Sequence, residues 1–225
     1  MPVFGLITEG PTDQVVIKHI LFGVFDDPDL PINPLQPKAD GDPANWVRVL
    51  DYCCSDDFKP SLVDNDFVIV QIDTDVLIRE QLPEKYKVDL PSSLSVDEII
   101  ERVSQLLIKL IDGDDDFWEH HGKQIIFAIS VHQIECWFLP IYFKNKTVKA
   151  AKITGCIDTL NEVLPQQEKG LYINGKDLSY YRQISKHFRK KIHDIYELNP
   201  SLKVFVEKLL EVGHRNENPP SIDDV

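Results

Sequence analysis

Acidic side chains follow three separate apolar segments of this 225-residue chain. Glu9 follows the first segment, Asp73 and Asp75 follow the second, and Glu135 comes shortly after the third. Carboxylate oxygens are hard ligands, and anions held close together disfavour ionisation unless a cation such as Mg²⁺ or Mn²⁺ lies among them. The residue types therefore predict a Mg²⁺ or Mn²⁺ site made by these four carboxylates, if the fold brings them together.

The segments before these acids have the composition of buried strands. Residues 67–72 are nearly all β-branched or aromatic, and residues 3–7 and 124–130 are similarly apolar. A short strand is also expected near 32–36. Helices are expected at 14–22 with Thr12 as its cap, at 45–51, and at 95–111 with a capping box of Ser95 and Glu98.

This alternation predicts an α/β fold with a mostly parallel, Rossmann-like sheet and helices on both faces. Side chains that follow parallel strands meet at one edge of such a sheet. Residues 1–143 are expected to form this core. Residues 144–212 read as a mainly helical extension packed on it, with helices at 156–164, 180–196 and 202–212, and residues 213–225 as a polar tail.

The order of these motifs resembles the TOPRIM superfamily. Residues 7–13, Ile-Thr-Glu-Gly-Pro-Thr-Asp, are similar to its first motif, and residues 72–75, Ile-Asp-Thr-Asp, are similar to its second. Residues 132–139 are similar to a segment of small stand-alone bacterial TOPRIM-like proteins, which are related to the nuclease domains of the overcoming-lysogenization-defect family. The resemblance covers about residues 3–143 and implies a TOPRIM-like sheet.

The resemblance also implies a function, namely metal-dependent cleavage or transfer at phosphodiester bonds. Asp73 and Asp75 would bind Mg²⁺ or Mn²⁺, and Glu9 would act as a ligand or as the general acid/base. The substrate would be a nucleic acid, DNA or RNA. Nucleases of this family often add a lysine from outside the core. The candidates in this chain, which the sequence does not rank, are Lys176, Lys186, Lys190 and Lys191.

The net charge of -13 argues against a protein that coats nucleic acid generally, because such affinity comes from lysine and arginine. The charge is uneven, since residues 1–143 carry -16 and residues 144–225 carry +3. In the basic part, one helix face could bind phosphates, although an ordinary solvated face explains the same pattern. The residues of that face are Lys186, Arg189, Lys190 and Lys191.

Two other functions fit parts of the sequence. Asp73 could be the nucleophile of a haloacid-dehalogenase-like phosphatase, with Asp75 as acid/base and Ser130 in the second motif, but Glu9 then has no role. Alternatively, the chain could be an inactive acidic binding or regulatory module whose surface mimics phosphate. Dependence of any activity on Mg²⁺ or Mn²⁺ separates the module from the enzymes.

The expected location is the cytoplasm, without a membrane partner. No stretch approaches the roughly 20 apolar residues that cross a bilayer. Cys53 and Cys54 are adjacent, whereas Cys136 and Cys156 stand alone, so all four are expected to be reduced thiols. A protein partner or a homo-oligomer is compatible with the sequence, which specifies neither.

Overall fold

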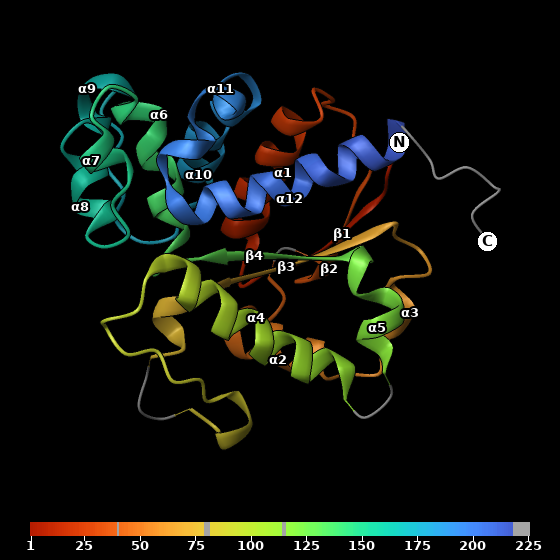
Figure 1. The fold of residues 1–225 in the computed structure, drawn as a ribbon. Coiled ribbons are helices and arrows are strands. Elements are labelled where there is room, and N and C mark those ends of the chain that lie inside the picture. Colours follow the sequence, from red (N-terminus) through yellow and green to blue (C-terminus); the bar gives the residue numbers. More distant parts are fainter. Residues whose placement is uncertain (40, 79–81, 114–115, 218–225) are drawn as a thin grey trace.

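The computed structural model describes residues 1–39, 41–78, 82–113 and 116–217. Within these residues the centre is a four-stranded sheet in which all neighbouring strands are parallel (Figure 1). The strand order is β2, β1, β3, β4, and the strands are β1 (Phe4–Ile7), β2 (Ile32–Gln36), β3 (Phe67–Asp73) and β4 (Ile125–Ser130). The predicted α/β fold with a parallel sheet is confirmed.

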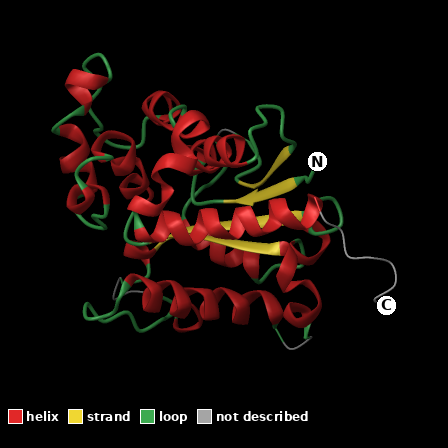
Figure 2. Cartoon of the chain, turned by 45° about the horizontal axis from the view of Figure 1, so that its top comes forward, coloured by secondary structure: helices red, strands yellow, loops and turns green. Residues whose placement is uncertain are grey.

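Helices cover both faces of the sheet, as Figures 1 and 2 show. On one face lie α1 (Pro11–Val24) and α12 (Pro200–Glu217), and on the other lie α2 (Trp46–Cys53) and α4 (Val96–Asp112). Side chains of β3 alternate between the two hydrophobic clusters that result. Ile69 packs with the α1 and α12 side, while Val68, Val70 and Ile72 pack with the α2 and α4 side.

The starts of two helices test the predicted caps. Helix α4 begins with the predicted capping box, in which Ser95 and Glu98 each accept a hydrogen bond from the other's backbone N–H. Helix α1 differs, because its N-cap is Gly10 and Thr12 lies inside the first turn, so the prediction that Thr12 caps it is wrong. Pro11 takes the first helical position, where its missing N–H costs no hydrogen bond.

Beyond residue 138 the chain is helical in many short pieces. They are α6 (Leu139–Phe143), α7 (Thr147–Ala150), α8 (Cys156–Asn161), α9 (Leu164–Gln167), α10 (Leu178–Ser185) and α11 (Phe188–Ile195), followed by α12. The single helix predicted over 180–196 is wrong, since α10 and α11 are separate. The turn between them is fixed by His187, whose Nε2 lies 2.7 Å from Oε1 of Glu168.

These C-terminal helices share a hydrophobic cluster with α1 and the sheet. Gly23 in α1 permits the contact with α11, because a Cβ atom there would stand 2.5 Å from the carbonyl oxygen of Phe188. Helix α12 runs to Glu217, so the predicted polar tail does not begin at 213, and its residues 218–225 lie outside the described part. Among the described helices, none is long and apolar enough to cross a bilayer.

Short elements complete the described chain and carry several of the residues discussed below. They are α3 (Phe58–Ser61), α5 (Phe117–His121) and the 3₁₀ turns η1 (Thr74–Val76), η2 (Glu84–Tyr86), η3 (Gly122–Gln124), η4 (Ile134–Phe138) and η5 (Tyr196–Leu198). Two of them follow strands at the carboxyl edge of the sheet. Turn η1 leaves β3 directly, and η4 follows β4 after three residues.

Candidate metal centre

The carboxyl ends of β1, β3 and β4 lie side by side, because β3 pairs in parallel with both neighbours. Glu9 follows β1, Asp73 ends β3 and is in register with Ser130 at the end of β4, and Glu135 lies in η4 just beyond. All four predicted carboxylates border one cavity of about 200 Å³ at this edge. Its polar lining is Glu9, Asp73, Asp75, Gln133, Glu135, Lys176 and Tyr181.

Hydrogen bonds link the ends of β1 and β3. Oε1 of Glu9 accepts the backbone N–H of Asp73 at 2.7 Å. Gln71 joins the same pair, because its Oε1 accepts the backbone N–H of Glu9 at 3.2 Å and its Nε2 donates to Oδ1 of Asp73 at 3.1 Å. Gln71 is fully buried in an otherwise apolar strand, which these bonds to the two acids explain.

Asp75 is positioned by the turn that follows β4. Its backbone N–H donates to the carbonyl oxygen of His132 at 3.1 Å, and Nε2 of Gln133 donates to its Oδ2 at 3.2 Å. The backbone N–H of His132 in turn donates to Oγ1 of Thr74 at 2.8 Å. The two post-strand turns therefore hold each other, and Asp75 faces the cavity from between them.

Glu135 receives its partner from the C-terminal helices. Its side chain is buried and accepts a hydrogen bond from the hydroxyl of Tyr181 in α10. Burial, followed by the charge of Glu135, raises the pKa of Tyr181, so this hydroxyl stays protonated as a donor. The sequence suggests Glu135 as a ligand but gives no sign of Tyr181, which lies 46 residues away.

The structure adds Asp13 to the acids of the candidate metal centre and places one of the four candidate lysines, Lys176, beside it. Asp13, in the first turn of α1, has a side chain that is only 1% exposed, and Nζ of Lys176 lies 3.2 Å from its Oδ1. Asp13 is part of the first motif in the sequence, but only the orientation of α1 in the fold shows that its side chain faces the site. Of the four candidate lysines, Lys176 alone lines the cavity.

The electrostatics of the site are dominated by crowded, buried negative charge. Burial, and then the charge of Asp13, raises the pKa of Glu9 to about 8. Burial likewise raises the pKa of Asp13, and it raises the pKa of Asp73 well above the ordinary range, with Glu9 adding to the effect. For Lys176, burial lowers the pKa, but the attraction of Asp13 and the other acids outweighs it and keeps the amine charged.

The donor set fits a hard divalent cation. Five carboxylates meet one lysine here, an imbalance that Mg²⁺ or Mn²⁺ would offset with oxygen ligands. Glu9, Asp73 and Asp75 are placed to hold such an ion, with Glu135 beside them. In the described part of the chain, no three His, Cys, Asp or Glu side chains already form a metal-ligand set, and these acids accept hydrogen bonds from protein groups instead.

The predicted phosphate-binding face lies outside this cavity. Lys186 and Lys190 are exposed and Lys191 is half-buried. Arg189 is also exposed, with its guanidinium 5.7 Å from the ring centroid of Phe22. None of these four lines the cavity, so any part they have in binding nucleic acid is at a distance from the carboxylates.

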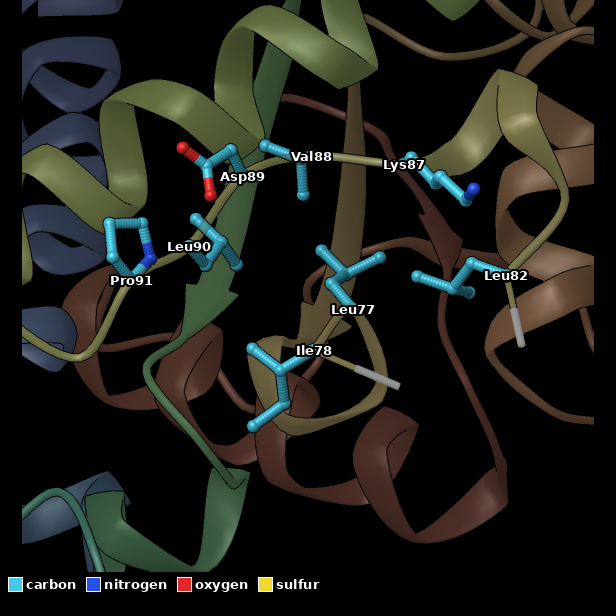
Figure 3. Close-up of a pocket in the computed structure, with 8 residues that line it drawn as sticks. All are labelled: Leu77, Ile78, Leu82, Lys87, Val88, Asp89, Leu90 and Pro91. Carbon is cyan, nitrogen blue, oxygen red and sulfur yellow. The ribbon is translucent and has the colours of Figure 1, made fainter. Parts of the chain in front are cut away.

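A second hollow, of about 450 Å³, follows the turn that carries Asp75 (Figure 3). It is mainly apolar and is lined by Leu77, Ile78, Leu82, Lys87, Val88, Asp89, Leu90 and Pro91. Its two charged members have partners, because Lys87 bonds to Glu84 at 2.7 Å and Asp89 lies 3.4 Å from Arg102. Among its described lining residues, this hollow therefore offers no group with unassigned acid or base chemistry.

Two cysteines correct the sequence-based expectation. Cys136 and Cys156 form a disulfide, with their Cα atoms 5.0 Å apart, whereas Cys53 and Cys54 are free thiols. The fold is the reason, because η4 packs on α8 and brings together two cysteines 20 residues apart. Cys136 directly follows Glu135, so the disulfide joins one wall of the candidate metal centre to α8.

Comparisons with known proteins add no relative. No protein-family model matches the chain, and neither a curated protein nor a solved structure does.

Proposed function

We propose that this protein is a divalent-metal-dependent nuclease of the TOPRIM type that acts on phosphodiester bonds of nucleic acid. The observation that carries the proposal is the convergence of Glu9, Asp73, Asp75 and Glu135 with Lys176 in one cavity at the carboxyl edge of a parallel sheet. Ligand sites of open α/β sheets are expected at this edge. A single site then combines metal ligands with a cation that can meet an anionic substrate.

Each group of the chain has a defined task in this proposal. Glu9, Asp73 and Asp75 would hold Mg²⁺ or Mn²⁺, whose chemistry when bound is Lewis-acid polarisation of a phosphoryl oxygen. Lys176 faces the same cavity and would stabilise negative charge that develops on the phosphoryl group. Glu9 is a ligand or the general acid/base, and the Tyr181 hydroxyl orients Glu135 at the wall.

The phosphatase alternative uses some of the same residues. Asp73 would then attack phosphorus, and Ser130, in register with it, would assist from β4. The hydroxyl of Ser130 is buried without a hydrogen-bond partner in the described chain, which is the observation in favour of this alternative. It assigns no task to Glu9, although this carboxylate lies at the same site. The nuclease uses more of the site and is preferred.

The location we propose is the cytoplasm, which the disulfide makes testable. Structural disulfides are rare in that compartment, where thiols are kept reduced. Protein isolated from cells under denaturing, alkylating conditions should therefore be analysed by mass spectrometry for its free thiols. Four alkylated cysteines would show that Cys136 and Cys156 are reduced in the cell, which supports the cytoplasm. Two alkylated cysteines would show that the disulfide is present in the cell, which indicates an oxidising compartment.

Cleavage assays test the proposal directly. Labelled single- and double-stranded DNA and RNA would be incubated with Mg²⁺, Mn²⁺ or EDTA, together with a small phosphomonoester. The wild type would be compared with Asp73→Asn, Glu9→Gln and the control Asp97→Asn, which changes an exposed acid in the first turn of α4. We expect metal-dependent cutting that only the first two variants lose.

Other outcomes would point to the alternatives. Hydrolysis of the phosphomonoester that depends on Asp73, without cutting of nucleic acid, would replace the nuclease with the phosphatase. No hydrolysis of either substrate with any metal would replace both enzymes with the acidic binding module.

A further inference from the structure

Helix α10 separates the candidate metal centre from a third hollow, of about 530 Å³. Tyr181 points into the metal centre, whereas its exposed neighbours Arg182 and Gln183 line the third hollow. The opposite wall comes from the segment after α9, including Glu168 and Lys169. Figure 1 shows α9 and α10 in the same C-terminal region of the molecule. The two sites are thus built on opposite sides of one short helix.

Three cations line this hollow, which we call the basic hollow. They are Lys169, Arg182 and Lys186, and all three are exposed. Within the described residues, none of them forms a salt bridge or a side-chain hydrogen bond. Three exposed cations without such a partner therefore gather in one depression of a protein of net charge -13, where they can bind an external anion.

The one carboxylate in the lining is already occupied. Glu168 accepts hydrogen bonds from the Tyr142 hydroxyl at 2.9 Å, from His187 at 2.7 Å and from Gln183 at 3.3 Å. Burial raises the pKa of Glu168, but these three donors outweigh burial and lower it, so Glu168 stays ionised while its oxygens are engaged by protein groups. Glu168 offsets one of the three positive charges, which leaves the lining of the basic hollow with a net charge of +2.

The next carboxylate along the chain is occupied as well. Asp177 caps α10, and its Oδ1 accepts the backbone N–H of Ser179 at 2.8 Å and the Ser179 hydroxyl at 2.6 Å. Ser179 lines the basic hollow, whereas Asp177 is not part of the lining. Of these two acids only Glu168 lines the basic hollow, so the lining stays positively charged.

The arrangement of the cations suits an anion with charges in series. Arg182 and Lys186 are four residues apart, which places them on the same side of the chain about 6 Å apart along a helix axis. Arg189 and Lys190 continue the exposed positive charge onto α11. A guanidinium binds phosphate through two parallel hydrogen bonds, and an ammonium binds it as a point charge. A nucleic-acid strand presents such phosphates one after another.

The backbone at the end of α9 places the third cation, Lys169. Its φ of 51° lies in the left-handed region, which a residue other than glycine or asparagine adopts at a cost of about 1 kcal/mol or more. This conformation is common one residue after the C-cap of a helix, and α9 ends at Gln167 with Glu168 as its C-cap. The side chain placed by this conformation is one of the three unpaired cations.

We propose that the basic hollow binds backbone phosphates of the nucleic-acid strand whose scissile bond lies in the metal centre on the other side of α10. This inference rests on the proposed nuclease function and names the surface that would grip its substrate away from the reacting bond. It predicts that strand affinity and its dependence on salt come from Lys169, Arg182 and Lys186, whereas cleavage comes from the carboxylates.

A binding assay without cleavage tests the inference. The full chain would be titrated onto fluorescent single-stranded DNA and RNA in EDTA, with anisotropy recorded between about 50 and about 200 mM salt. The test variant carries Lys169→Gln, Arg182→Gln and Lys186→Gln. The matched control carries Lys38→Gln, Lys109→Gln and Lys123→Gln, which remove the same charge at exposed positions outside this hollow. Thermal unfolding of both variants checks that each is folded.

Loss of three phosphate contacts should lower the slope of log affinity against log salt by about 2, since each contact with a single strand contributes about 0.7. Over a fourfold salt range the wild type then loses roughly 20-fold more affinity than the test variant. The control should keep the slope of the wild type. Equal slopes for the test variant and the control, or no binding of either strand by the wild type, would overturn the inference.

Hydrolysis of bis(p-nitrophenyl) phosphate keeps this outcome separate from the fate of the nuclease proposal. This phosphodiester carries a single phosphate, so it cannot occupy the metal centre and the basic hollow at the same time. If the test variant hydrolyses it as the wild type does, while its salt slope is unchanged, the proposed function stands and the basic hollow does not. If the salt slope of the test variant is lower than that of the wild type, but the wild type cleaves no phosphodiester, the basic hollow stands and the proposed function does not.

Discussion

Stability against pH offers a quantitative prediction about Glu9. Its pKa in the folded, metal-free protein is raised to about 8, first by burial and then by Asp13, from 4.5 in an ordinary chain. The folded state therefore holds a proton on Glu9 that the unfolded chain has released. The resulting stability is fully present below about pH 4.5 and is lost as the pH rises through about 8.

The size of the effect follows from proton linkage. One proton changes the free energy of unfolding by up to about 1.4 kcal/mol for each pH unit. The slope falls as the pH approaches 8, so the loss between about pH 6.5 and about pH 8 is about 1.6 kcal/mol, or roughly 3–6 °C in Tm for a chain of this length. His19, whose pKa is lowered to about 4 by burial and then by Arg189, opposes this loss only slightly, because most of its gain in stability with rising pH is reached by pH 6.5, its ordinary pKa.

Urea denaturation in EDTA at both pH values would measure the loss. Glu9→Gln should reduce it, whereas Glu119→Gln, at an exposed glutamate, should leave it as in the wild type. Excess Mg²⁺ should also reduce it, because a bound cation favours the ionised carboxylates. A loss that is the same in Glu9→Gln as in the wild type, or no loss at all, would refute the reasoning from buried charge.

Three further changes have expected results. Lys176→Gln should lower kcat of nucleic-acid cleavage by at least about 10²-fold. It should also lower the free energy of unfolding in urea by about 1–2 kcal/mol, because Asp13 loses its cation, and the cost stays this small because the Lys176 side chain is 47% exposed. An unchanged kcat would exclude Lys176 from the mechanism. Tyr181→Phe should destabilise the fold by about 1–3 kcal/mol through the lost donor to Glu135 and should weaken Mn²⁺ binding, and a variant with wild-type affinity for Mn²⁺ would show that the bond serves packing alone. Reduction of the disulfide, which spans 20 residues, should cost about 3 kcal/mol as read from urea midpoints in the presence and absence of a dithiol, and identical midpoints would contradict this.

The sheet and the start of α4 follow from local patterns in the sequence. The β-branched residues of 67–72 specify a strand buried on both faces, and Ser95 with Glu98 specifies the start of α4. The convergence of Glu9, Asp73 and Glu135 could be predicted for a related reason, because parallel strands place their carboxyl ends together whatever their spacing in the chain.

The rest of the site depends on contacts between distant segments. Lys176 meets Asp13 across 163 residues, and Tyr181 meets Glu135 because α10 packs beside η4, so no local spacing indicates either pair. The local rule that a threonine caps the following helix fails at Thr12, since Gly10 is the N-cap of α1 and Thr12 lies inside its first turn. The Cys136–Cys156 disulfide likewise reflects the packing of η4 on α8, which the amino-acid pattern does not contain.

The central claim is that these carboxylates form a divalent-cation site, and titration with Mn²⁺ tests it most directly. Free Mn²⁺ would be followed by electron paramagnetic resonance for the wild type, Asp73→Asn and the exposed control Asp97→Asn at about pH 7.5, where the ordinary carboxylate is ionised. The account predicts saturable binding by the wild type and the control, and at least about 10-fold weaker binding by Asp73→Asn. Equal affinity in all three proteins, or no binding by the wild type, would contradict it.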